Sequence, residues 1–527
     1  MNATWNSCEP HMLLLIHPPV SKPCEPPAGI SRLAGALKHR NMPFQVWDAN
    51  IESFAWLFQR PQTRFDTFTH RAFLHKSTHL AELKSASAYS AIETYHQAVK
   101  SLDRLLYTAG ADQGTRITFS NYTDTGLSPL KSKDLLQAAS FPEKNFFYPF
   151  FKNRLEVLFE TLPIKTIGIS LNYLSQALPA FAIMGIIKRL KKNLRVVLGG
   201  GLATSWLSRP DWKNPFSEIV DEWVSGPGEA QLIKLLGGLT SDGDIPPDYT
   251  ELPLDDYFSP CRILPYSAAA GCYYRKCDFC PEKAEKNRYH PLSVEKVLTD
   301  LSALRESVNP GLIHFLDNAI SPKLMKALAE TPPEIPWYGF ARFTHHLSDP
   351  EFCERLKRSG CVMLQLGLES GDQKVLDNLH KGVNLELASR SLQVLHKSGI
   401  ATYVYLLFGT PGETLIEASH TLDFVTRHKD HIDFLNLAIF NLPAFSPDQE
   451  QLDTMPFYQG DLSLYTDFKH PLGWNRFQVR TFLEKEFKRH PAIHEIVKRD
   501  PPWFSSNHAP FFPSKTILSF NKNPRQV

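Results

Sequence analysis

The chain has 527 residues, 43% of them hydrophobic, and a formal net charge of +2. This length predicts two to four domains with sizeable cores. The nearly balanced charge, with no long run of one sign, gives no electrostatic case for a nucleic-acid or acidic-surface partner. The longest apolar stretch, ALPAFAIMGII at 177–187, is too short to cross a bilayer, so no membrane span is predicted.

The N-terminal stretch HMLLLIHPPV lacks a basic region and a cleavage site. We therefore expect no signal peptide and a cytoplasmic protein. Thiols stay reduced in that compartment. Eight cysteines, three of them clustered, then indicate metal or redox chemistry rather than disulfides.

The first half of the chain alternates between strand and helix patterns. Strands are predicted at 12–20, 44–50, 164–171 and 194–201, and helices at 28–41 and 177–192. This alternation predicts an α/β fold with a Rossmann-like, doubly wound parallel sheet over residues 10–240. A mostly helical insertion is expected at about 54–160. The proline- and acid-rich segment 241–260 is predicted to be a linker.

A second alternation begins after the linker. Strands are predicted at 263–271, 312–319, 337–343, 362–370, 401–409 and 433–440. With the helical patterns between them, they indicate a partial (β/α)6 TIM-like barrel over 261–444. The active site of such a barrel lies at the carboxyl ends of its strands. Residues 445–527 are expected to form a small helical C-terminal extension that shapes the substrate entrance.

The stretch GCYYRKCDFCPEK, residues 271–283, follows the first predicted barrel strand and carries Cys272, Cys277 and Cys280. Thiolates suit zinc and iron–sulfur clusters. Structural zinc sites usually close with four ligands in two pairs, whereas here no second CxxC exists and His290 is the only imidazole nearby. A cluster held by three cysteines leaves one iron open to a small molecule. A non-catalytic zinc or iron–sulfur protein remains the alternative of another class.

This loop resembles that of the radical SAM superfamily. Those enzymes carry three cysteines, usually with three and then two residues between them, after the first strand of a partial β/α barrel. An aromatic residue commonly precedes the last cysteine, as Phe279 does here. The four residues between Cys272 and Cys277 make this loop one residue longer than the usual pattern.

Further segments resemble the same superfamily, namely IHFLDNAIS, GFARF, LGLES and LLFGTPGET. The resemblance implies that SAM is bound by Phe279, Asp317, Arg342, Glu369, Ser370, Gly409 and Pro411. Taken singly, Asp317 could be a helix cap and Arg342 a structural ion-pair partner. The implied cofactors are a [4Fe–4S] cluster and S-adenosyl-L-methionine, and the implied reaction is reductive cleavage of SAM to a 5′-deoxyadenosyl radical. The electron would come from a donor such as flavodoxin or ferredoxin.

The N-terminal half resembles the cobalamin (B12)-binding domain that often precedes such barrels. The matching segments are DANIES at 48–53, SLN at 170–172, the glycines at 199–200 and GPGE at 226–229. The resemblance implies that cobalamin is bound by Asp48, Asn50, Ser170, Gly199, Gly200, Gly228 and Glu229. Asn50 stands where the family has histidine, so a bound cobalamin would lack the usual lower axial ligand. A generic nucleotide-type or vestigial domain is the alternative.

Together these resemblances imply a cobalamin-dependent radical SAM methyltransferase. Its substrate would be a small molecule or natural product with an unactivated carbon or phosphorus centre. A cobalamin-free radical SAM enzyme, performing a rearrangement, oxidation or ring chemistry, is the alternative within the superfamily.

Overall fold

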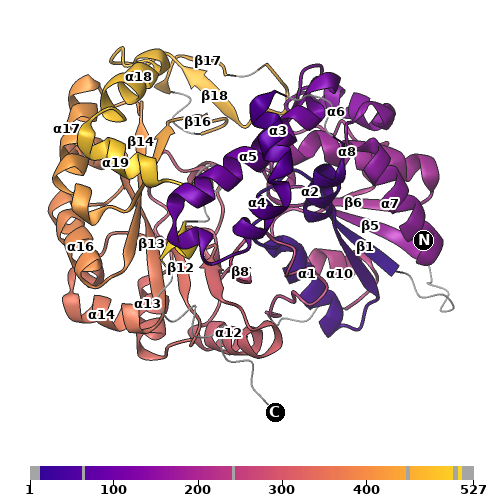
Figure 1. Ribbon diagram of the computed structural model, residues 1–527, viewed down its shortest axis with the longest axis horizontal. Coiled ribbons are helices and arrows are strands. Elements are labelled where there is room, and N and C mark those ends of the chain that lie inside the picture. Colours follow the sequence, from indigo (N-terminus) through magenta and orange to yellow (C-terminus); the bar gives the residue numbers. More distant parts are fainter. Residues whose placement is uncertain are drawn as a thin grey trace. The chain divides into compact units, whose positions relative to one another are not determined.

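The computed structural model describes residues 12–61, 66–239, 244–446, 451–457, 459–501 and 508–512 (Figure 1). Contacts divide the chain into two compact units. The first takes in the chain up to Lys76, Ser101–Tyr257 and Gly460–Leu462, and the second takes in the rest. Residues 241–243 of the predicted linker, and residues 447–450, 458, 502–507 and 513–527 of the predicted C-terminal extension, lie outside the described residues. The domain boundaries read from the sequence stay predictions.

The first unit is built on a five-stranded parallel sheet with the order β2-β1-β5-β6-β7. Its strands are β1 (Met12–His17), β2 (Phe44–Asp48), β5 (Ile164–Ser170), β6 (Arg195–Gly199) and β7 (Glu222–Trp223). Residues 13–16 of β1 are all buried, as expected for a strand covered on both faces. The predicted parallel sheet is confirmed. Its strand order reverses between β1 and β5, where ligands of such sheets bind at the carboxyl ends.

Helices fill the remainder of this half of the chain. They are α1 (Ala28–His39), α2 (Ala49–Gln59), α3 (Thr67–Leu74), α4 (Lys76–Leu83), α5 (Ile92–Gly110), α6 (Ser132–Ser140), α7 (Tyr148–Thr161), α8 (Leu174–Leu190), α9 (Gly201–Leu207) and α10 (Glu229–Leu235). A short hairpin joins β3 (Thr115–Ile117) to β4 (Tyr122–Asp124). The region between β2 and β5 is therefore mostly helical, as the sequence predicts. Two of the divisions between the units fall within helices, after Lys76 in α4 and after Lys100 in α5.

The second unit is an open barrel of six parallel strands with the order β8-β11-β12-β13-β14-β15. The strands are β8 (Ile263–Tyr266), β11 (Leu312–Phe315), β12 (Trp337–Ala341), β13 (Cys361–Glu369), β14 (Ala401–Phe408) and β15 (Phe434–Ile439). Its helices are α12 (Val294–Val308), α13 (Pro322–Glu330), α14 (Pro350–Arg358), α15 (Gln373–Asn378), α16 (Leu385–Lys397) and α17 (Leu415–Arg427). Figure 1 shows α16 and α17 along the outer side of the strands. The predicted partial (β/α)6 barrel is confirmed.

A piece of the C-terminal tail covers the amino ends of these strands. Buried residues near the strand starts, among them Ile263, Leu312 and Phe434, form one hydrophobic cluster with Ala509. The His508 ring stacks on Tyr403 with 4.2 Å between ring centroids. This end of the barrel is therefore closed by packing, which leaves the carboxyl ends of the strands for chemistry.

After β15 the chain forms a small antiparallel sheet, then helices. The sheet contains β16 (Leu442–Pro443), β17 (Thr454–Pro456) and β18 (Tyr465–Phe468), followed by α18 (Arg476–Phe482) and α19 (Pro491–Arg499). The sequence predicts only helix here, because strands of two to four residues are too short to display an alternating pattern.

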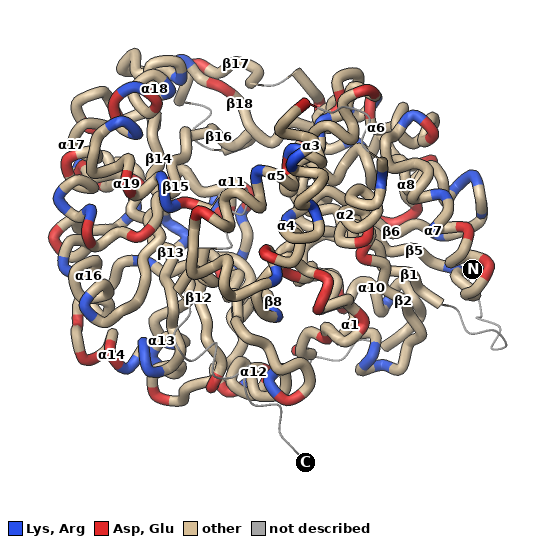
Figure 2. Tube along the Cα trace, in the orientation of Figure 1, with Lys and Arg blue, Asp and Glu red and all other residues tan. Residues whose placement is uncertain are grey.

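Lys and Arg residues are interspersed with Asp and Glu residues along the helices of each unit, as the colours of Figure 2 show. None of the helices in the described ranges is long and apolar enough to span a bilayer.

Close packing of α8 on α6 gives a test of the first unit. A Cβ atom at Gly185 would lie 2.0 Å from the Ala139 carbonyl oxygen. We expect Gly185→Ala to lower the free energy of unfolding by about 1–3 kcal/mol through overpacking. Urea denaturation measures the effect. Gly201→Ala is the matched control, because its added Cβ meets its nearest neighbour at an ordinary 3.7 Å. Equal stability of the two variants would contradict this packing.

Candidate active site

The loop that carries the three cysteines, residues 272–280 and here called the cysteine loop, begins directly after β9 (Ala269–Ala270). That strand pairs antiparallel with β10 (His290–Pro291), which closes the base of the loop. Asp317, at the turn after β11, accepts a hydrogen bond of 2.9 Å from the Ala268 N–H. Its side chain is only 2% exposed. Asp317 therefore fixes the start of the cysteine loop, and its predicted contact with SAM stays a prediction.

The three cysteine side chains lie at different depths. Cys277 is buried, whereas Cys272 and Cys280 are partly buried. The pKa of Cys280 is raised to about 11, chiefly by burial, with smaller contributions from the charges of Cys277 and Cys272. Burial also raises the pKa of Cys277, although the charges of Lys381 and Arg342 oppose the shift. A coordinating metal deprotonates such thiols outright.

The donor set fits an iron–sulfur cluster with one open iron. Three thiols come from one short loop, and they are near enough for the charges of two of them to act on Cys280. Thiolates are the usual ligands of these clusters. Over the ranges that the structure describes, no three His, Cys, Asp or Glu side chains converge tightly enough to hold a single metal ion.

The cysteine loop docks on residues 379–382, which follow α15 and are here called the docking segment. The Asp278 N–H donates to the Leu379 carbonyl oxygen at 3.1 Å. The Asp278 carboxylate also contacts Nδ1 of His380 at 2.5 Å. The Tyr274 hydroxyl donates to the His380 carbonyl oxygen at 3.0 Å. These bonds hold a loop that contains little regular secondary structure of its own.

Arg342, just beyond β12, lies against both the loop and the docking segment. Its guanidinium donates to the Lys381 carbonyl oxygen and, at 3.7 Å, to Sγ of Cys277. The guanidinium carbon lies 3.5 Å from the centre of the Tyr274 ring, a close cation–π contact. The Arg342 guanidinium therefore binds protein groups around Cys277. The sequence alone did not predict these contacts.

Glu369, at the carboxyl end of β13, has a left-handed backbone with φ of 69°. That conformation is strained for a residue with a side chain, and such strain is concentrated at functional sites. Its Oε1 accepts a salt bridge of 2.7 Å from the buried Lys381. The Lys381 ammonium also lies 5.4 Å from the Phe279 ring centre. Two predicted SAM-binding residues, Glu369 and Phe279, are thus joined through a lysine that the sequence reading missed.

The remaining predicted SAM-binding residues lie in the turns after β13 and β14. The Ser370 hydroxyl is buried, is hydrogen-bonded to Thr421 and accepts from the Asp372 N–H. Gly409 has a positive φ of 78°, and Pro411 follows it in the same turn. The structure therefore brings these residues to the carboxyl edge of the barrel, and their contact with SAM stays a prediction.

Glu413 stabilises the turn after β14 through hydrogen bonds of its carboxylate. One of its oxygens accepts from the Gly409 N–H and, at 3.1 Å, from Nε1 of Trp474. Burial raises the pKa of Glu413 to about 7. The sequence reading did not single it out, although the carboxylate two residues after Pro411 in GTPGET offered a signal.

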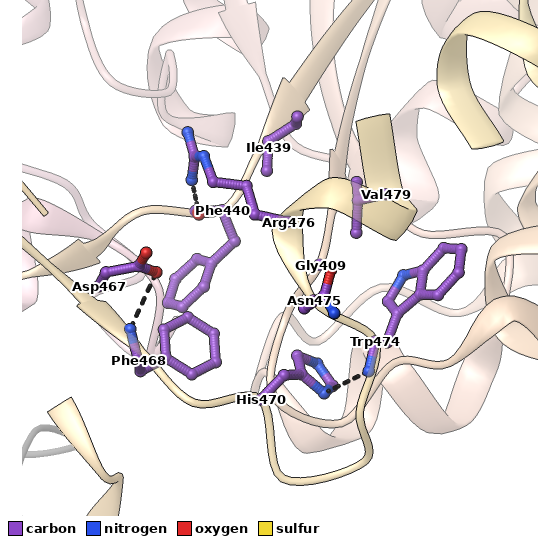
Figure 3. Close-up of a pocket in the computed structure, with 10 residues that line it drawn as sticks. All are labelled: Gly409, Ile439, Phe440, Asp467, Phe468, His470, Trp474, Asn475, Arg476 and Val479. Carbon is purple, nitrogen blue, oxygen red and sulfur yellow. Dashed lines mark hydrogen bonds between the residues drawn. The ribbon is translucent and has the colours of Figure 1, made fainter. Parts of the chain in front are cut away.

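A small, open pocket lies beside Gly409 (Figure 3). One side is formed by the ends of β14 and β15, and the other by residues 467–479 of the C-terminal extension. Nδ1 of His470 accepts a hydrogen bond from the backbone N–H of Trp474 at 3.2 Å, and the Arg476 guanidinium donates to the Phe440 carbonyl oxygen at 3.1 Å. The extension therefore contributes a wall at the carboxyl edge of the barrel.

In the first unit, the predicted cobalamin residues lie after strands of the parallel sheet. Asp48 caps α2 by accepting the N–H groups of Asn50 and Ile51, both at 3.1 Å, and it also accepts the Tyr257 hydroxyl at 2.5 Å. Asn50 is only 1% exposed, and its amide both accepts from and donates to the Ser21 backbone. The Asn50 side chain therefore holds the segment after β1 in place through the Ser21 backbone. Its predicted contact with cobalamin stays a prediction.

The other five predicted residues follow β5, β6 and β7. Ser170 ends β5 and accepts from Nδ2 of Asn172. Gly199 and Gly200 form the turn into α9, where a Cβ at Gly200 would lie 2.5 Å from the Leu171 carbonyl oxygen. Gly228 precedes α10, and Glu229 pairs with Arg32. Because the sheet is parallel, these turns share one edge, at the carboxyl ends of the strands.

Comparison with known proteins identifies the class of the barrel. Residues 266–425 match the family model of the radical SAM superfamily. An uncharacterized methyltransferase of Pyrococcus horikoshii is 23% identical over 300 residues, which cover 49% of this chain and 63% of that protein. The bacteriochlorophyllide d C-12(1)-methyltransferase of Chlorobaculum tepidum is 26% identical over 388 residues, covering 69% of this chain and 84% of that protein.

The fold as a whole is similar to a solved radical SAM methyltransferase, TsrM from Kitasatospora setae, whose structure holds cobalamin and a [4Fe–4S] cluster. The TM-score is 0.52 at 15% identity, and the match covers 84% of this chain and 78% of that one. The radical SAM domain implied by the resemblance of the cysteine loop and the other barrel segments is confirmed over 266–425.

Asp317 gives a pH-dependent test. Burial raises the pKa of its carboxyl to about 7, from an ordinary value of 3.8. As pH rises from about 4 to 7, the unfolded chain releases this proton while the folded protein keeps it, so folding stability falls. Asp317→Asn still accepts the Ala268 N–H but cannot titrate. Relative to this variant, the free energy of unfolding of the wild type should fall by about 1.4 kcal/mol for each unit by which the folded-state pKa exceeds the unfolded-state pKa. Urea unfolding of both proteins from pH 4 to 8 measures the loss, and parallel stability curves would contradict it.

Proposed function

We propose that the chain is a cobalamin-dependent radical SAM methyltransferase that acts on an unactivated carbon or phosphorus of a small molecule. One observation carries the proposal. Cys272, Cys277 and Cys280 lie on a loop held at the carboxyl end of the first barrel strand, inside the stretch that matches the radical SAM superfamily. When bound there, a [4Fe–4S] cluster and SAM supply a 5′-deoxyadenosyl radical.

The residues of the chain would hold and orient these groups. The three cysteines would bind the cluster through their thiolates. Phe279, Asp317, Glu369, Ser370, Gly409 and Pro411 are our proposed SAM-binding residues. Since Oε1 of Glu369 is paired with Lys381, its second oxygen is our candidate acceptor for a group of SAM.

Cobalamin binding by the first unit is supported by its sheet topology and by its turns. The strand order reverses between β1 and β5, the place where doubly wound sheets bind ligands. Gly226, in the turn between β7 and α10, has no other atom within 4 Å of the place where a Cβ would lie, so backbone could approach a ligand closely there. Both amide ends of Asn50 are bonded to Ser21. Any cobalamin would therefore be held without a cobalt ligand from Asn50.

The same engagement of Asn50 favours one alternative, a cobalamin-free radical SAM enzyme on the same scaffold. In that case the buried bonds of Asp48 and Asn50 would be purely structural. The chemistry would be a rearrangement, an oxidation or a ring reaction.

The cluster requires a one-electron donor, for which we propose a flavodoxin or a ferredoxin. We propose the cytoplasm as the compartment, because free thiols persist in a reducing environment.

The cluster assignment predicts iron bound by three cysteines. After anaerobic reconstitution, we expect about four irons per chain, and loss of most of that iron when Cys272, Cys277 and Cys280 are all replaced by Ala. Iron and sulfide analysis with a UV–visible spectrum measures this. Cys353→Ala is the control, since Cys353 is buried in α14 and away from the loop. A triple variant that keeps its iron, or a wild type that binds one zinc, would refute the assignment.

The methyltransferase assignment predicts bound cobalt and two products. The protein should copurify with about one cobalamin, and turnover should form S-adenosylhomocysteine as well as 5′-deoxyadenosine. Cobalt analysis and mass spectrometry of the products test this. Formation of 5′-deoxyadenosine alone by a corrinoid-free protein would instead support the cobalamin-free alternative.

A further inference from the structure

Tyr274 is one of the four residues between the first two cysteines. This side chain spans two segments that are distant in sequence. Its ring lies under the Arg342 guanidinium at 3.5 Å, and its hydroxyl donates to the His380 carbonyl oxygen at 3.0 Å. Gly382 lies directly against it, since a Cβ there would approach the Tyr274 hydroxyl to 2.0 Å. The docking segment is therefore shaped to receive this tyrosine.

The Arg342 guanidinium is held from several sides. It is 7% exposed, and its partners are the Tyr274 ring, Sγ of Cys277 and the Lys381 carbonyl oxygen. None of these three partners is a carboxylate. The nearby Lys381, by contrast, forms a salt bridge with Glu369. No carboxylate among the three partners therefore neutralises the positive charge that Arg342 places beside the cysteine loop.

Two other cations lie on the loop itself, and one of them, Lys276, has its ammonium 5.8 Å from the centre of the Tyr274 ring. Arg275 and Lys276 follow Tyr274 directly in the sequence, and both side chains are exposed. Solvent screens exposed charges, whereas a charge inside a protein acts more strongly on its neighbours. Of the cations near Cys277, Arg342 is the one that donates a hydrogen bond to its sulfur.

We propose that Tyr274 is a positioning residue, which holds Arg342 against the Cys277 sulfur and so raises the reduction potential of the cluster. The inference rests on the proposed function, because it requires a cluster on this loop. Reduction adds one electron, taken from a low-potential donor that is itself oxidised, and so adds negative charge to the cluster. A cation and a hydrogen bond at a ligating sulfur stabilise that added charge.

The proposal gives Arg342 a role other than the SAM contact that the sequence resemblance implied. A SAM-binding arginine would change the affinity for SAM and leave the potential of the SAM-free cluster unchanged. An arginine that acts on the Cys277 sulfur would change that potential when SAM is absent. The two roles therefore separate in one measurement.

The experiment is a redox titration of the reconstituted, SAM-free protein, followed by EPR of the reduced cluster with dithionite as electron donor. Arg342→Met should lower the ratio of reduced to oxidised cluster about tenfold at a fixed applied potential, which is about 59 mV for one electron. Tyr274→Leu should lower the ratio in the same direction. Tyr274→Phe keeps the ring beneath the guanidinium and should stay near wild type. Arg275→Met is the matched control, since it removes one positive charge from an exposed position of the same loop.

Each outcome has a distinct reading. A wild type without a four-iron cluster overturns the proposed function and this inference together. A wild-type cluster whose potential is unchanged by Arg342→Met and Tyr274→Leu, or changed as much by Arg275→Met, overturns the inference alone. If Arg342→Met fails to retain iron, Arg342→Lys decides, because it keeps the charge. A lysine variant with iron and a potential near wild type supports the inference, and loss of iron in that variant too contradicts it.

Discussion

The contact between the cysteine loop and the docking segment is the interaction on which the rest of the candidate site depends. The loop carries three thiols but little regular secondary structure, so its shape must come from its neighbours. Asp278 and Tyr274 bind the backbone of residues 379–380, and Arg342 joins the loop to Lys381. A segment about a hundred residues further along the chain thereby sets the geometry of the cysteines.

The residues that stabilise the barrel and those of the candidate site lie at opposite ends of its strands. At the amino ends of the strands, Ala509 and the strand starts make a closed hydrophobic cluster. At the carboxyl ends, the structure accepts features that cost free energy, such as the left-handed backbone of Glu369 and the buried carboxyls of Asp317 and Glu413. Such costs are tolerated where a packed scaffold supports them.

The sequence was sufficient to predict the two α/β folds, because the strands display apolar runs and the helices a 3.6-residue period. The class of the barrel was predicted from a resemblance carried jointly by the three cysteines and by the segments IHFLDNAIS, GFARF, LGLES and LLFGTPGET, because the spacing of Cys272 and Cys277 departs from the usual pattern. Lys381 and the Arg342–Tyr274 contact could not be predicted, since they depend on tertiary contacts between distant segments. The same holds for Asn50, whose amide was matched to a ligand position by sequence but is bonded to Ser21 in the folded unit.

The central claim is that three cysteines leave one iron of the cluster open to SAM. Electron–nuclear double resonance on the reduced protein, with SAM labelled by ¹⁵N and ¹⁷O in its methionine part, tests that claim most directly. Binding of SAM at the open iron should give hyperfine couplings from both the amino nitrogen and a carboxylate oxygen of SAM. An intact reduced cluster in the presence of saturating SAM that shows neither coupling would contradict it.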